Sequence, residues 1–113
     1  LRTVLDGSVA CITALAALRS ADGTLEDFIY TAVNRAAEQL EGLPAAQMLG
    51  RRISQLFPGV VTQGLYTRYV AVLESGQPQR FEFYYDADDF CGWIDMSVVK
   101  QDDGLILTYL DIT

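Results

Sequence analysis

Hydrophobic residues occupy nearly every position from 9 to 18, and a strand-like pattern resumes over 25–33 after a short polar turn. An Ala-rich run of this length also has the composition of a helix. The turn contains Asp22-Gly23, a pair that favours tight hairpins, and the second segment is rich in β-branched and aromatic residues. We therefore predict two strands that pair as a hairpin.

Three short helices are predicted after the hairpin. Asn34 precedes the first as an N-cap, and Gly42 follows it as a stop signal. Pro44 can open the second helix, which Gly50 ends, and Pro58 closes the third. The predicted ranges are 35–40, 44–48 and 53–57.

Residues 60–75 form the longest segment with helical periodicity, and Gly76 marks its end. Three strands are expected after it, over 79–85, 91–100 and 105–112. Apolar and polar positions alternate in the first two, whereas the last is apolar on both sides. Short loops join these strands as antiparallel hairpins.

The order of elements predicts the fold class. Two strands, a block of helices and three strands are typical of α+β proteins rather than of a parallel sheet. The expected architecture is a five-stranded antiparallel sheet with short helices and one longer helix on one face. The first and last strands are apolar on both sides, so they should lie side by side in its centre. Residues 1–6 form a lead with apolar positions at helical spacing.

Length and charge narrow the function. The chain has 113 residues, enough for one domain with a real core and too few for two. Its net charge of −7 opposes the phosphate neutralisation that nucleic-acid binding requires, so we expect no nucleic-acid partner. No apolar stretch is long enough for a membrane helix, and no signal-peptide layout opens the chain. We expect a cytoplasmic domain without membrane contact and, because it begins at Leu1 rather than Met, one excised from a longer signalling protein.

The cysteines and the acidic loop give no metal site. Cys11 and Cys91 are expected, buried or half-buried, on strands separated by another strand, about 10 Å apart and too far for a disulfide. Without a CxxC pair or any histidine, no zinc site is expected. The loop with Asp86, Asp88 and Asp89 lacks the spacing of a calcium loop, so we interpret it as an exposed acidic turn.

Short segments follow one another along the chain in a recognisable order. They are Leu5-Asp6-Gly7-Ser8, Asp22-Gly23, Asp27-Phe28, Val33-Asn34-Arg35-Ala36-Ala37, Leu49-Gly50-Arg51, Leu56-Phe57-Pro58, Glu74-Ser75-Gly76-Gln77-Pro78, Trp93, Asp103-Gly104 and Asp111-Ile112-Thr113. Each is weak alone, but the ordered series, over almost the whole chain, resembles the PAS family. The resemblance implies a five-stranded antiparallel sheet around a small pocket, as in bacterial sensor histidine kinases of two-component systems and in diguanylate cyclases. It also implies homodimers, and a signal relay in which Asp111, Ile112 and Thr113 join the sheet to a linker and an output domain.

The resemblance also limits the cofactor. Light-sensing flavin members resemble Gly-X-Asn-Cys-Arg-Phe, in which the cysteine bonds to the flavin. Here Arg52 stands at the Asn position and Ile53 at the Cys position, so cysteinyl-flavin photochemistry is not expected. Histidine-ligated haem is not expected either, because the chain has no histidine. A non-covalently held flavin, a metabolite or an empty core stay open.

Strand alternation predicts where a small-ligand pocket would lie. If the residue before Asn34 points inward, as the resemblance suggests, Ile29 also points inward, and a pocket forms between sheet and helices. The candidate pocket residues are Ile12, Ala14, Thr31, Val33, Ile53, Phe57, Leu65, Tyr69, Phe83, Ile94 and Met96. The competing interpretation is a solid core, since regularly spaced apolar side chains usually pack.

The same alternation predicts the direction of several other side chains. The hydroxyls of Thr31, Tyr69 and Tyr84 could orient a ligand. Phe28 and Tyr30 are expected on the open face of the sheet, where residues 1–5 or a second subunit would cover them.

The residues support a sensory function better than catalysis. We expect a non-catalytic sensory or dimerising module whose ligand state is relayed through Asp111. The alternative is a small enzyme of the ketosteroid-isomerase type with Asp95 and Tyr69 as its acid–base pair, for which a buried Asp with a raised pKa would be required. A scaffold that only dimerises is the third possibility.

Overall fold

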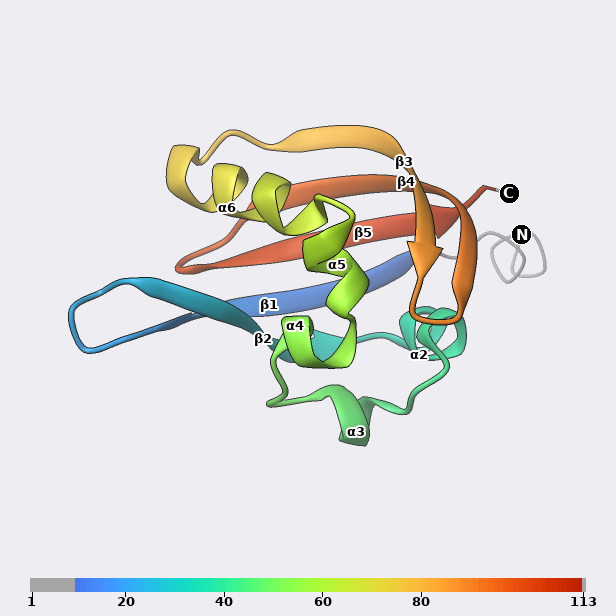
Figure 1. The fold of residues 1–113 in the computed structure, drawn as a ribbon, viewed down its shortest axis with the longest axis horizontal. Coiled ribbons are helices and arrows are strands. Elements are labelled where there is room, and N and C mark those ends of the chain that lie inside the picture. The colour runs from blue at the N-terminus through green and yellow to red at the C-terminus, as the bar shows by residue number, and fades with distance from the viewer. Residues whose placement is uncertain (1–9, 113) are drawn as a thin grey trace.

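The computed structural model describes residues 10–112 and shows a sheet with helices on one face (Figure 1). The elements are β1 (Cys11–Arg19), β2 (Leu25–Val33), α2 (Arg35–Glu41), α3 (Ala45–Met48), α4 (Ile53–Leu56), α5 (Pro58–Thr62), α6 (Leu65–Ser75), β3 (Gln79–Ala87), β4 (Phe90–Lys100) and β5 (Gly104–Asp111). The predicted α+β class and all five strands are confirmed. The predicted lead at residues 1–6 lies outside the described residues. No helix within residues 10–112 is long and apolar enough to cross a membrane.

The sheet has the order β2-β1-β5-β4-β3, and every neighbouring pair is antiparallel. The apolar first and last strands therefore lie side by side near the centre, as their patterns predicted. Cys11 and Cys91 are free and lie on β1 and β4, which β5 separates. Cys11 is buried, but Cys91 is exposed on the sheet face that no described helix covers, which we call the uncovered face, so its predicted burial was wrong.

Asn34 attaches the first helix to the sheet. Its side-chain oxygen accepts hydrogen bonds from the backbone N–H of Ala37 and of Ile12, both at 3.0 Å, and its amide nitrogen donates to the Ala10 carbonyl. Gly42 ends α2 in the left-handed conformation with φ 76°. The predicted cap and stop are thus confirmed, and Asn34 also holds α2 against β1.

The predicted helix over 60–75 is divided in two. Gly64, with φ 92°, separates α5 from α6, because a left-handed residue cannot continue a right-handed helix. Pro58 opens α5 at its first turn, where its missing N–H costs no hydrogen bond. α6 packs on β4 and β5 and buries Tyr69, Val72 and Leu73.

A β-bulge decides which side chains of β2 point inward. Ala14 pairs with Ala32, but Leu15 pairs with Tyr30, so Thr31 is an extra residue on β2. Because side chains alternate along a strand, the extra residue reverses the facing of the β2 positions that precede it, relative to a count made back from Val33. The prediction for Phe28 and Tyr30 was therefore wrong, since both are buried beneath the helices at 0% and 3% exposure.

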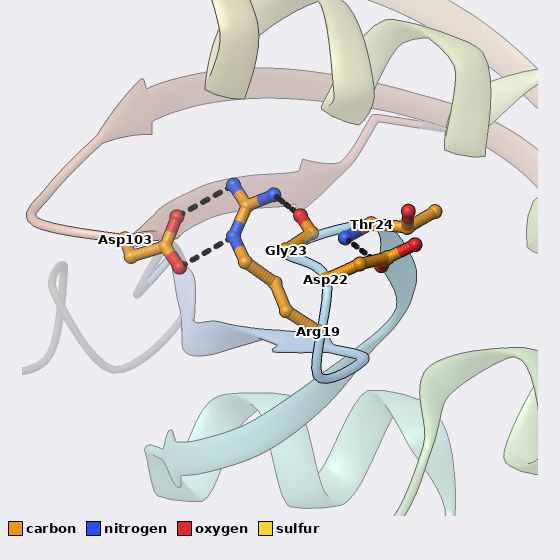
Figure 2. A network of polar contacts seen from close by, with 5 residues as sticks. All are labelled: Arg19, Asp22, Gly23, Thr24 and Asp103. Atoms are coloured by element: carbon orange, nitrogen blue, oxygen red, sulfur yellow. Dashed lines mark hydrogen bonds and ion pairs between the residues drawn. The ribbon is translucent and has the colours of Figure 1, made fainter.

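Opposite the end where β5 finishes, two loops are tied together (Figure 2). The Arg19 guanidinium donates from Nε and Nη2 to the two carboxylate oxygens of Asp103, both at 2.8 Å, and from Nη1 to the Gly23 carbonyl at 2.9 Å. Asp22 accepts from the Thr24 N–H at 3.0 Å and from the Ser20 hydroxyl, and these bonds lower the pKa of Asp22 to about 2. The β1–β2 turn and the β4–β5 loop are thereby fixed to one another, and we call this region the loop end.

Candidate functional site

A cavity of about 600 Å³ lies between the helices and the sheet. Part of its lining comes from the last turn of α2, the β3–β4 turn and β5. The last turn of α2, the β3–β4 turn and the end of β5 lie at one end of the sheet, which we call the cavity end (Figure 1). The lining residues are Thr13, Tyr30, Leu40, Glu41, Gly42, Leu43, Ile53, Leu56, Phe57, Val60, Leu65, Tyr69, Tyr85, Asp88, Asp89, Phe90, Ile94, Met96, Leu107 and Tyr109. Its size lies within the range of small-ligand pockets, about 300–1,000 Å³.

Glu41 brings a carboxylate to this cavity from the last turn of α2. The Tyr109 hydroxyl donates to Glu41 Oε2 and lies 3.1 Å from the Thr13 hydroxyl. Since Tyr109 has one proton to donate, Thr13 is the donor in that second bond. Burial raises the pKa of Glu41 although part of the side chain borders open space, and the Tyr109 bond offsets this rise only partly.

Asp88 brings a second carboxylate from the β3–β4 turn. Asp88 and Asp89 have φ 55° and 66°, which is the backbone of a two-residue hairpin turn that Asp tolerates. One oxygen of Asp88 accepts from the Gly59 N–H at 3.0 Å and from the Tyr85 hydroxyl. Asp88 is therefore half-buried and bound to α5, rather than part of a fully exposed acidic turn.

Tyrosine hydroxyls supply the other polar groups of the cavity. The Tyr69 hydroxyl contacts only the weak acceptor Met96 Sδ, at 3.5 Å, among the hydrogen-bond partners within residues 10–112. Burial raises the pKa of Tyr30, Tyr69, Tyr85 and Tyr109, and the negative field of Glu41 adds to each rise. All four hydroxyls therefore remain protonated near neutral pH.

The structure brings together six of the predicted pocket residues. Around the cavity lie Ile53, Phe57, Leu65, Tyr69, Ile94 and Met96. Phe83 and Val33 pack at the edge of the core without lining the cavity. The other three predicted residues lie on the uncovered face of the sheet: Ile12, Ala14 and Thr31. On β1, Thr13 pairs with inward-facing Val33, so its neighbours Ile12 and Ala14 point outward. On β2, the bulge places Thr31 on the outer face.

Several cavity residues escaped the sequence reasoning. The most important are Thr13, Tyr30, Glu41, Tyr85, Asp88 and Tyr109. Glu41 could have been noticed in the sequence, because an acidic residue in the last turn of a helix interacts unfavourably with the helix dipole. Such a residue is a candidate for a functional role. The inward alternation Phe81, Phe83, Tyr85 also pointed to Tyr85. Nothing local could have identified Asp88.

The predicted relay residues follow directly on the cavity. Tyr109 lies two positions before Asp111, which ends β5 opposite Ile94. The Ile112 N–H donates to the Trp93 carbonyl at 2.9 Å, so the sheet pairing continues past β5. Thr113 lies outside the described residues.

The proposed acid–base pair is not assembled. Asp95 lies on the uncovered face and pairs with Arg80 at 2.8 Å, whereas Tyr69 is buried beneath the helices on the other face. Hydrogen bonding to Arg80 lowers the pKa of Asp95, the opposite of what such a catalyst needs. Tyr84 also faces outward, where its hydroxyl contacts Cys91 Sγ at 2.7 Å. Within residues 10–112, no group of acidic and cysteine side chains is arranged to hold a metal ion.

The chain belongs to the PAS family, since the family model described as "PAS fold" matches residues 5–113. PAS domains are generally sensory modules without catalytic activity. No curated protein sequence matches the chain significantly.

Solved structures share this fold at low sequence identity. The PAS domain of the Cronobacter turicensis RpfR quorum-sensing receptor in complex with BDSF is 17% identical with a TM-score of 0.68, over 92% of this chain and 94% of that one. A domain of the sensory box sensor histidine kinase/response regulator from Geobacter sulfurreducens is 20% identical with a TM-score of 0.63, over 97% and 89%. A Rhodobacter sphaeroides LOV protein is 15% identical with a TM-score of 0.68, over 98% and 64%.

Proposed function

We propose that this PAS domain is a non-catalytic sensory module that binds a small ligand in the cavity and relays its occupancy to an output domain of the same parent chain. The observation that carries the proposal is the position of Tyr109, which lines the cavity and lies two residues before Asp111. A ligand that displaces the Tyr109–Glu41 hydrogen bond acts directly on the end of β5. Such a ligand shifts the balance between two arrangements of that end, by as much as it prefers one of them.

The nature of the lining supports non-covalent binding. It is largely apolar, with convergent hydroxyls and carboxylates, which is the composition of small-molecule sites. It contains neither cysteine nor histidine among the described residues, so neither side chain is available there for a covalent flavin bond or for haem ligation. A metabolite or a non-covalently held cofactor fits this chemistry.

Native mass spectrometry and hydrogen exchange test the sensory proposal. We expect the purified domain to retain or take up a small molecule, and binding to slow amide exchange at residues 109–112. In the intact parent, Asp111→Ala is expected to uncouple ligand binding from output activity while affinity stays unchanged. A domain that takes up no small molecule, or an unchanged output in the Asp111→Ala parent, contradicts the proposal.

We also propose that the domain forms a homodimer through the uncovered face of the sheet. Ile12, Tyr84, Trp93 and Val99 project from this face with 44–47% of their surface exposed among the described residues. A two-fold axis would let one such patch cover another copy of itself. Light scattering at several concentrations tests this, and Val99→Glu, which places a charge on this face, should give a monomer. A wild-type monomer at all concentrations contradicts the dimer.

A further inference from the structure

The charges around the cavity have one sign. Glu41, Asp88 and Asp89 line it, and no lysine or arginine does so within residues 10–112; histidine is absent from the chain. Several arginines are engaged elsewhere, Arg19 with Asp103, Arg80 with Asp95 and Arg52 with Glu26. Arg68 lies over the Phe81 ring at 4.2 Å. An anionic ligand would thus enter a negative cavity with no described cation to pair with.

Aromatic rings form part of the cavity wall. Six rings line it, those of Tyr30, Phe57, Tyr69, Tyr85, Phe90 and Tyr109. Tyr30 and Phe57 meet edge to face with centroids 6.3 Å apart, and Tyr85 and Phe90 are tilted at 6.4 Å. The faces of such rings carry negative potential, which attracts ammonium groups. The rings and the carboxylates therefore favour the same charge.

One polar group in the cavity lacks a partner. Tyr30 is only 3% exposed, and its hydroxyl has no hydrogen-bond partner among the described residues. Since no fully enclosed side-chain oxygen is left without a partner in the described part of the chain, this hydroxyl borders open space of the cavity. Its oxygen can accept a hydrogen bond from a ligand N–H. The Tyr30 hydroxyl is therefore placed to contact a polar group of a ligand in the cavity.

We propose that the cavity binds a protonated organic amine with an apolar body, the ammonium group pairing with Glu41 and donating to the Tyr30 hydroxyl. This inference rests on the proposed sensory function and specifies its ligand class. The apolar body packs against side chains such as Ile53, Leu65 and Met96. A cation beside Glu41 compensates the unfavourable burial of its charge. The overall negative charge of the chain also attracts cations from solution.

The test compares ligands that share one apolar body and differ only in the charged group. The probes are 2-phenylethylamine, 2-phenylethanol and 3-phenylpropanoate, together with octylamine, octanol and nonanoate, measured by calorimetry at neutral pH. We expect each amine to bind at least about tenfold more tightly than its alcohol, because a charge-assisted bond and cation–π contacts are added. We expect the carboxylates to bind more weakly than the alcohols.

Matched variants test which residues cause the preference for amines over alcohols. Glu41→Gln keeps the shape of the side chain and an acceptor for Tyr109, and should reduce amine affinity about tenfold while alcohol affinity stays unchanged. Glu82→Gln makes the same change on the exposed face of β3 and should alter neither affinity. Tyr30→Phe should weaken amine binding about threefold by removing the acceptor. Circular dichroism confirms that each variant folds, and the wild-type comparison needs no variant.

The outcomes separate this inference from the sensory proposal. If a carboxylate or an alcohol binds as tightly as its amine, or if Glu41→Gln leaves amine affinity unchanged, the amine proposal is overturned and sensing stands. The same holds if no probe binds while native mass spectrometry finds a retained anionic or neutral molecule. If no probe binds and the domain holds no small molecule, both proposals fail.

Discussion

The two ends of the sheet differ in how their charged side chains are paired. At the loop end, the Arg19 guanidinium pairs with Asp103 and with the Gly23 carbonyl, and Asp22 accepts from the Thr24 N–H of its own turn (Figure 2). At the cavity end, Glu41 and Asp88 face a hollow without any described cation among the lining residues. The loop end therefore pairs opposite charges, whereas the carboxylates of the cavity end accept hydrogen bonds from hydroxyl and backbone N–H groups and pair with no described cation.

The two ends of the sheet also differ in how closely they are packed. At the loop end Gly104 begins β5 so close to β1 that an added Cβ would overlap the Leu15 carbonyl oxygen. Leu105, the next residue of β5, is only 1% exposed. At the cavity end the same strand carries Tyr109, whose ring borders about 600 Å³ of open space. One continuous strand therefore begins in close-packed surroundings and ends beside the cavity, which suits the relay proposed at Asp111.

The largest expected change in stability comes from adding a methyl group at Gly104, where β1 and β5 pack closely. Gly104→Ala should lower the free energy of unfolding by about 3 kcal/mol, because the new methyl group meets backbone that cannot move aside. The control Gly23→Ala has φ 87° but open space around it, and should cost about 1 kcal/mol from backbone strain alone. Urea unfolding measures both. Equal losses would show that β1 and β5 do not pack rigidly there.

At the cavity end, Glu41→Gln is expected to raise stability at high pH, by less than Gly104→Ala lowers it. Burial raises the pKa of Glu41 above that of an unfolded glutamate, so the folded state holds this proton more tightly. Wild-type stability therefore falls, relative to Glu41→Gln, as pH rises from the ordinary carboxyl pKa through the raised one. We expect the variant to melt a few degrees higher than wild type at pH 8.

Thermal melts across pH 3 to 8 check this sign. The two melting temperatures should converge below the ordinary glutamate pKa of about 4.3, where the carboxyl group is protonated in both states. A variant that melts lower than wild type at pH 8 would mean that the Tyr109 bond outweighs the burial of the charge.

The smallest effect is expected from the ion pair at the loop end. Hydrogen bonding to Arg19 lowers the pKa of Asp103, so its contribution to stability is present above the ordinary aspartate pKa and is lost as pH falls through the lowered one. Asp103→Asn should therefore melt slightly lower than wild type at neutral pH and equally in acid. The difference should shrink in high salt, because the pair is exposed.

A neighbouring residue supplies the control for this pair. Asp102→Asn removes the same charge from the same loop, and Asn tolerates its φ of 54°. It should leave the melting temperature nearly unchanged. If both variants lose the same stability, net charge rather than the contact with Arg19 is responsible.

Local signals in the chain predicted the elements and the sheet order. Asn34 and Gly42 act through neighbouring backbone groups, so their roles could be deduced without the fold. Leu65, Tyr69, Ile94 and Met96 were placed inward correctly because periodicity is unbroken around them. The division at Gly64 was missed, since an isolated glycine within a helical pattern is often tolerated.

The family resemblance and the α+β arrangement were thus determined by the sequence, because hydrophobic periodicity, caps and turn residues act over a few positions. The faces of β1 and β2 were decided by tertiary structure, since one bulged residue, Thr31, reverses the alternation and only the pairing with β1 selects it. The chemistry of the cavity was decided there too. Glu41, Asp88 and Tyr109 are distant in sequence, and only the packing of a helix end, a turn and a strand end brings their polar groups to one space.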